Sequence, residues 1–372
     1  MEALPAMAVA SSAPHGAPRP IMILRTLAAA TAGGGLFAAL GLPAAWLSGA
    51  LTAVAVLAIF GANVTVTRGI RGAAFIALGV MMGAAVTPET LTGMRNSPIS
   101  IAVLVLSVAA TMAAVTFYLR RFAGWDGRTA FYASAPGALS TALALATQDG
   151  ADVRRVAFAQ AIRLFIIVAL LPGALVSFGL SVAMPLPLPP PLLGSLGIGT
   201  AGELALMAVT GIIGGIAADR AKVPGGLLFG AMFASAILHA GGLVTALLPD
   251  YVLIPSFIAL GASVGARFAG SDLATLKHFL LASLGAFAVA AGVALAFALL
   301  AAALSGEGVG KVIVAFAPGG VEAMSALAFV IGLDPAFVAA HHIVRFLLIG
   351  LLLPFAARLL FGPAPAGEDP VS

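Results

Sequence analysis

The feature that most constrains this chain is a stretch that occurs twice. The first copy runs from Ala135 to Pro172 and the second from Ala317 to Pro354, and matched positions are 182 residues apart without a gap. In each copy a Pro-Gly pair interrupts an apolar segment, and an arginine follows inside the next one. Proline cannot donate a backbone hydrogen bond and breaks helices. Because broken segments at matching places in two halves indicate transporter binding sites, the pair predicts one site built by both halves.

Composition places the chain in a lipid bilayer. It is 61% hydrophobic and 9% charged, whereas a soluble domain carries about 25% charged residues. We therefore expect an all-α, multi-pass protein of the cell (inner or plasma) membrane. The formal charge of +4 reports loop orientation in such a protein and gives no reason to expect nucleic acid.

Cysteine and histidine usage narrows the chemistry. The absence of cysteine excludes disulfides, thiolate metal sites and cysteine nucleophiles. The five histidines show no HExxH or other metal-binding spacing. We therefore expect no metal site and no cofactor.

Apolar segments near the roughly 20 residues that a membrane span needs divide the chain into two repeats. We expect a disordered tail at 1–20, a first repeat at 21–180, a Pro-rich linker at 181–199, a second repeat at 200–361 and a polar tail at 362–372. The six segments of each repeat are placed at about 21–41, 44–61, 70–90, 99–119, 129–147 and 151–178, and at about 200–219, 225–247, 252–270, 275–303, 311–332 and 335–361.

The duplication also includes paired glycines. Gly79-xxx-Gly83 matches Gly261-xxx-Gly265 at the same offset. Small residues at this spacing let helices approach closely in lipid, so we expect these glycines to serve packing.

Basic residues predict that the two repeats have opposite orientations. With twelve full spans and a cytoplasmic N-terminus, nine basic residues fall inside and seven outside. If each Pro-Gly element enters and leaves on one side, the count becomes fourteen inside and two outside, Arg95 and Lys311. The positive-inside rule favours this second arrangement. Each repeat then has five spans and one broken or re-entrant element, although a different non-spanning element would also invert the halves.

These residues resemble a known family. The Ala-Pro-Gly element, the aspartate after it, the arginine in the last helix and the whole duplication are similar to the AbrB-like membrane proteins, also catalogued as ammonia monooxygenases. The resemblance covers nearly all of residues 21–361. It implies an integral membrane protein, with one branch linked to regulation of gene expression, and it implies no agreed catalytic residues.

Two arginines are the leading site candidates. Arg163 and Arg345 lie about a dozen residues into their segments, near mid-depth of a roughly 30 Å hydrocarbon core. An intramembrane arginine is costly and usually functional, and its planar fork suits carboxylate or phosphate. The alternatives are a structural lock on carbonyls freed by the broken helix, or an ion pair with Glu322 or Asp152.

The Pro-Gly elements are the second part of the predicted ligand site. Pro136, Gly137, Pro318, Gly319 and Gly320 should leave backbone groups without helical partners. Such groups are tolerated at membrane depth only against protein or a water-filled cavity, and helix N-termini there favour an anion. The alternative is a plain kink.

Glu322 and His342 are the candidate proton-coupling residues. A carboxyl group inside the membrane can carry a proton, and histidine titrates near neutrality. In the first repeat Ser140 occupies the place of Glu322 and Gln160 that of His342, and we assign both to the ligand site. A fixed ion pair for Glu322 and a packing role for the histidine are the alternatives.

Four other polar residues have structural interpretations. Asp152 and Asp334 follow a turn and precede a helix, as N-caps do. His341 and His239 are interpreted as hydrogen-bonded packing residues.

Three functions fit the sequence. The first is a secondary transporter, not an enzyme, for a small and anionic metabolite, with the lipid bilayer and this ligand as partners. The second is a membrane-embedded ligand sensor or regulator affecting gene expression. The third is a metal-dependent ammonia monooxygenase, which needs about three clustered ligands where only His341, His342 and Glu322 are close in sequence. A homo-oligomer is a further option.

Overall fold

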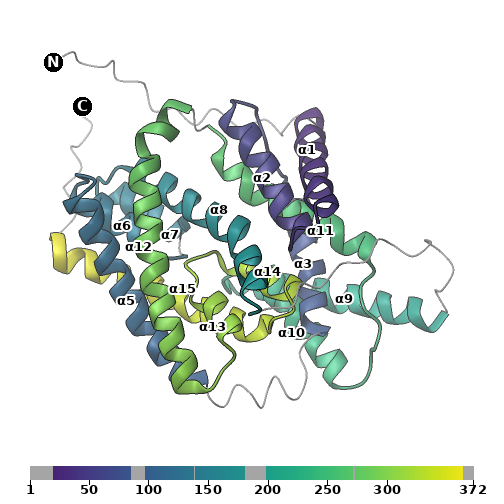
Figure 1. Cartoon of the computed structure of the whole chain (residues 1–372). Helices are drawn as coiled ribbons and strands as arrows, with labels where there is room; N and C mark the ends of the chain where they lie inside the picture. The colour runs from purple at the N-terminus through teal and green to yellow at the C-terminus, as the bar shows by residue number, and fades with distance from the viewer. Residues whose placement is uncertain (1–19, 85–96, 138, 181–197, 271–272, 363–372) are drawn as a thin grey trace, which may run out of the picture.

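The protein is helical and crosses the membrane several times. The computed structural model describes residues 20–84, 97–137, 139–180, 198–270 and 273–362, and all regular structure there is helix (Figure 1). Seven helices in these ranges are long and apolar enough to cross a membrane. The composition therefore predicted a helical, multi-pass membrane protein correctly. The expected tails and nearly all of the linker lie outside the described residues.

The first six predicted segments form seven helices, because segment 129–147 is divided into two. They are α1 (Pro20–Ala39), α2 (Ala45–Ile59), α3 (Arg68–Ala84), α5 (Ser97–Arg121), α6 (Gly127–Ser134), α7 (Leu139–Gln148) and α8 (Val153–Ser177).

The second six segments are divided in the same way, at 311–332. They form α9 (Ile198–Arg220), α10 (Gly226–Ala240), α11 (Asp250–Gly265) with the short 3₁₀ helix η2 (Ala266–Phe268), α12 (Leu273–Ser305), α13 (Val309–Phe316), α14 (Val321–Val330) and α15 (Pro335–Phe361).

Two helices are shorter than the spans that we expected at 44–61 and 225–247. α2 and α10 have 15 residues each, about 22 Å of helix against a hydrocarbon core of roughly 30 Å. Positive-φ glycines just past their ends, Gly61 and Gly242, turn the chain there. α3, with 17 residues, is also shorter than the candidate spans. The described part of the chain therefore has seven candidate spans, three fewer than the ten that five spans per repeat would need.

The helices pack as two groups. The scaffold group consists of α1, α2, α3, α9, α10 and α11, at the right of Figure 1; the site group consists of α5 to α8 and α12 to α15. Helices within one group contact each other far more extensively than helices of different groups. The contacts between the two groups are made mainly by α2 and α8. There the Ser48 hydroxyl on α2 donates to the Val168 carbonyl on α8 at 2.9 Å.

Paired glycines hold the scaffold group together, as expected. At each of them an added Cβ would collide with a backbone carbonyl oxygen of the facing helix. The contacts join Gly79 to Leu228, Gly83 to Met232, Gly261 to Leu47 and Gly265 to Leu51. α3 therefore packs on α10 as α11 packs on α2, an exchange between equivalent helices.

Candidate functional site

We call the interruption between α6 and α7 the first break and the one between α13 and α14 the second break. Arg163 lies at the centre of α8 and contacts the first break. Its side chain is only 6% exposed, and its Nη2 donates to the carbonyl oxygen of Ala135 at 3.0 Å. Ala135 is the C-cap of α6, so its carbonyl has lost its helical donor. The arginine thus supplies a charge-assisted hydrogen bond to the negative end of a helix.

Arg345 makes the equivalent contact at the second break, with additional bonds. Its Nη1 donates to Ala317 and its Nη2 to Gly319, each at 2.7 Å, and its side chain is 2% exposed. Ala317 is the C-cap of α13. Both arginines are therefore bonded to carbonyls freed by a broken helix, as a structural lock would be.

The two breaks meet each other. Gly137 has φ +86°, and a Cβ at this position would lie 3.0 Å from the Gly319 carbonyl oxygen and 3.0 Å from Nη2 of Arg345. The unwound backbone of the first break therefore contacts the unwound backbone of the second break and its arginine. Pro136 and Pro318 are buried beside this crossing.

Part of each guanidinium remains unsatisfied. Among the described residues, Nε of Arg163 and Nε of Arg345 are buried without a hydrogen-bond partner. The two side chains also repel each other electrostatically. The ion pairs described join Arg155 to Asp152 and Lys311 to Glu307, so neither buried arginine has a described carboxylate partner. An uncompensated buried charge is costly, and a bound anion would reduce that cost.

His342 and Gln160 occupy equivalent positions beside the arginines. Nε2 of Gln160 donates to the Tyr132 carbonyl at 3.1 Å, and Nε2 of His342 lies 3.1 Å from the Val314 carbonyl. A carbonyl only accepts, so this histidine nitrogen carries the hydrogen. The other nitrogen, Nδ1, then accepts from Nη2 of Arg345 at 2.7 Å. A neutral imidazole satisfies both contacts.

Glu322 lies just after the second break, at the start of α14. It is half-buried in the first turn of α14, where a carboxylate is favoured by the helix dipole. Its charged neighbour is Arg267, in η2 of the scaffold group. An ion pair with Arg163 or Arg345, one of our alternatives for this residue, is not among the described contacts.

The remaining predicted residues have mixed outcomes. Asp152 and Asp334 cap α8 and α15 by accepting backbone N–H bonds, as predicted. Gly320 is the N-cap of α14, which has no side-chain cap. The side chain of Ser140 lies outside what is described.

Two histidines are bonded as packing residues. The ring nitrogens of His239 meet the carbonyl oxygens of Ser235 and Ala246 at 2.9 and 3.1 Å. His341 is fully buried between Ser100 and Phe337. Within the described ranges no three His, Asp or Glu side chains gather as metal ligands.

An apolar cavity of about 250 Å³ adjoins the second break. Its wall includes Ala317 and Pro318 together with side chains of α8, α12 and α13. A larger cavity of about 950 Å³, between α5 and α15, includes neither buried arginine.

Comparison with known proteins identifies the family of this chain. The family model described as "Transition state regulatory protein AbrB" matches residues 46–361. The chain belongs to the AbrB family. It is 28% identical over 355 residues to "Putative regulator AbrB" of Escherichia coli (strain K12), covering 88% of this chain and 93% of the relative. It is also 27% identical over 297 residues to "Uncharacterized protein YhjN" of Bacillus subtilis (strain 168), covering 76% of each.

Proposed function

We propose that this AbrB-family protein is a secondary transporter of a small anionic metabolite. The observation that carries the proposal is the pair of buried guanidinium groups at the crossing of two broken elements, each with an unpartnered Nε. Water-excluded arginines with free donors favour a carboxylate or a phosphate. The half-helices α7 and α14 begin at the breaks, and their N-terminal dipoles also favour an anion.

We further propose that the two repeats have opposite orientations in the membrane. Several contacts recur at the offset of 182: Arg163 and Arg345 to C-cap carbonyls, and Gln160 and His342 to carbonyls 28 residues earlier. The crossed glycine packing of the scaffold group is consistent with a two-fold relation. The two Pro-Gly elements then enter and leave on opposite sides of the membrane.

Movement would occur between the two helix groups. The site group carries both arginines and both breaks, and its contacts with the scaffold group are sparse. The scaffold group, whose helices pack closely at the paired glycines, would stay fixed. Rocking of the site group against it would expose the crossing of the two breaks to each side of the membrane in turn.

The proposal excludes an enzymatic role. Metal analysis of the purified protein tests this point, because stoichiometric copper or iron would support the monooxygenase alternative.

The function is tested with purified protein in proteoliposomes. Inorganic phosphate and a panel of radiolabelled mono- and dicarboxylates are first screened by thermal shift, and those that bind are tested for uptake. Arg163→Gln should abolish binding and uptake, whereas Arg154→Gln, on the exposed start of α8, should leave both unchanged. Equal responses of the two variants would refute the site.

A sensor remains the second candidate. The observation in its favour is the name of the Escherichia coli relative, "Putative regulator AbrB". A sensor would use the same arginines to bind the anion. Saturable binding without uptake in the same proteoliposomes would favour this function.

A further inference from the structure

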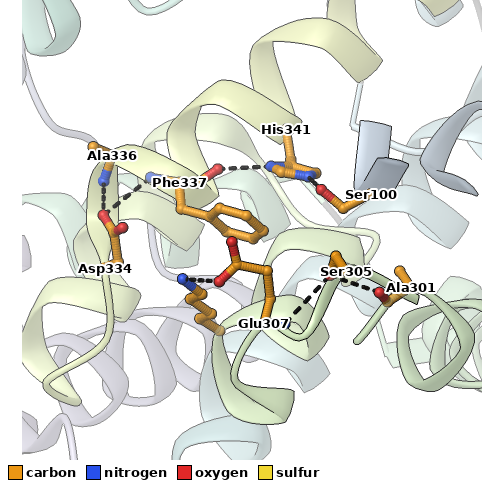
Figure 2. A network of polar contacts seen from close by, with 9 residues as sticks. Ser100, Ala301, Ser305, Glu307, Asp334, Ala336, Phe337 and His341 are labelled. Carbon is orange, nitrogen blue, oxygen red and sulfur yellow. Dashed lines mark hydrogen bonds and ion pairs between the residues drawn. The ribbon is translucent and has the colours of Figure 1, made fainter. Parts of the chain in front are cut away.

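The structure contains a second polar cluster, at the end of α13 opposite the second break. Glu307 and Lys311 form an ion pair at the start of α13, and Asp334, the N-cap of α15, is their electrostatic neighbour. We call these three residues the Glu307 cluster. In Figure 2, Glu307 lies below the ring of Phe337, Asp334 lies to the left of that ring, and His341 lies above it. By the count of basic residues, this cluster lies on the outer side of the membrane.

Phe337 separates the cluster from His341. The Lys311 ammonium lies 4.7 Å from the centroid of the Phe337 ring, and the His341 ring lies 4.1 Å from it, tilted by 35°. Phe337 is 1% exposed and His341 0% exposed. The Phe337 ring therefore covers the buried imidazole on the side where the charged residues gather, and the Phe316 ring lies 6.2 Å from the same imidazole.

The hydrogen bonds of His341 let it accept a proton without losing a partner. Its Nδ1 lies 2.8 Å from the Phe337 carbonyl, which only accepts, so Nδ1 carries the hydrogen. Its Nε2 lies 2.8 Å from the Ser100 hydroxyl, which then donates. A hydroxyl both donates and accepts. When a proton adds to Nε2, the Ser100 O–H can turn and its oxygen can accept, so both bonds survive.

His342 lacks this freedom. Its Nδ1 accepts from the Arg345 guanidinium, a group with no acceptor. A proton on Nδ1 would replace that bond by contact between two cations. Of the two adjacent histidines, His341 has the better geometry for holding a proton.

We propose that His341 is a proton-binding site and that Phe337 is the gate between it and the Glu307 cluster. A proton reaches Nε2 from water at the cluster when the Phe337 ring moves, and leaves by the same nitrogen. The charged groups around His341 are Glu307, Lys311 and Arg345, with His342 as its titratable neighbour.

The proton site would couple to the anion site. An anion beside Arg345 offsets the positive charge that opposes a proton on His341, so each ligand favours the other. This role rests on the proposed function, whereas the proton site itself can be tested without an anion.

The first repeat has no histidine and no phenylalanine at the equivalent positions. The residues equivalent to His341 and Phe337 are Ala159 and Arg155. Arg155 pairs with Asp152 at 3.1 Å and lies 5.7 Å from the ring centroid of Trp125. Proton entry is therefore assigned to the side of the second repeat.

The test is ¹⁵N NMR of histidine-labelled protein in liposomes, without added anion. His341→Gln assigns the signal. At pH 8 the wild-type His341 should be neutral with the hydrogen on Nδ1. Phe337→Ala should raise its protonated fraction at pH 6 several-fold, because water reaches the ring. Phe355→Ala, on the exposed face of α15, should leave it unchanged.

Charge variants provide a second test that keeps Phe337. Glu307→Gln should lower the protonated fraction of His341, and Lys311→Gln should raise it, because a carboxylate favours and an ammonium opposes the added charge. A His341 signal that responds to neither charge variant nor to Phe337→Ala would overturn the proposal. So would protonation of His342 in place of His341. If the His341 signal responds as predicted but the wild-type protein does not transport an anion, only the coupling between the proton site and the anion site is refuted.

Discussion

At the scale of single residues, the two buried arginines differ in how strongly they are held. Arg345 bonds two carbonyls and His342, whereas the described bond of Arg163 is to one carbonyl. Each bond involving a charged group contributes roughly 1.5–3 kcal/mol. Arg345 is thus the stronger structural lock, and Arg163 has more capacity left for a ligand.

This difference predicts unequal responses to substitution. Arg345→Gln should lower the thermal midpoint in detergent markedly, because several charge-assisted bonds are lost. Arg163→Gln should lower it less and abolish anion binding. Arg163→Lys should restore binding only in part, because a point charge cannot reproduce the bidentate fork. Equal loss of stability in Arg163→Gln and Arg345→Gln would contradict this assignment.

The equivalence of His342 and Gln160 gives a second residue-scale prediction. In His342→Gln the amide can donate to Val314 and accept from Arg345, as the imidazole does. The variant should therefore fold with a thermal midpoint close to wild type. A pH dependence of anion binding that persists in His342→Gln would point to His341, and one that disappears would point to His342. Binding assays across pH 5–8 with both single variants make the comparison.

At the scale of elements, sequence reasoning located the breaks and missed their contact. The Pro-Gly pairs predicted unwound backbone at 136–137 and 318–319, because proline and glycine act locally. That Gly137 meets Gly319 depends on how distant helices pack, which no local pattern encodes. The depth of each arginine follows from its position within its own segment, so it could be predicted. The bonds to carbonyl groups depend on packing between helices, so the structural lock stayed one of three interpretations of the arginines. Glu322 was an alternative ion-pair partner for the arginines, but its charged neighbour comes from the scaffold group.

The crossing of the breaks predicts a specific cost at Gly137. Gly137→Ala adds a Cβ at positive φ and 3.0 Å from Arg345 and Gly319. Gly61 also has positive φ, at +83°, but open space around it. Gly61→Ala should cost about 1–2 kcal/mol from backbone strain alone, and Gly137→Ala more. If the two variants melt at the same temperature, the breaks are not in contact.

The glycine exchange in the scaffold group gives a matched pair of variants. Gly79→Ala and Gly261→Ala each force a methyl group against a carbonyl oxygen of the facing helix. Overpacking of this kind costs typically 1–3 kcal/mol, so both should lower the thermal midpoint similarly. Gly292→Ala, on α12 with nothing nearby, is the control. A loss in only one of the pair would show that the two helix contacts are not equivalent.

At the scale of the whole molecule, orientation decides whether one site can serve both faces of the membrane. Parallel repeats would put both Pro-Gly elements on one side. Inverted repeats would give each side its own entrance, one near Asp152 and one near Asp334. The basic residues favour inversion, but the seven candidate spans do not establish it, because α2, α3 and α10 are short for a span.

Equivalent positions therefore provide the deciding measurement. Arg68 begins α3 and Asp250 begins α11, 182 residues later. Gly41 and Lys222 both have positive φ in the turns after α1 and α9. The chain has no cysteine, so single cysteines at these four positions can be labelled in intact cells with an impermeant maleimide. Inverted repeats predict labelling at 41 and 250 from outside, and at 68 and 222 only after permeabilisation. Labelling of 68 and 250 from the same side would make the repeats parallel, and the two broken elements would then open to one face.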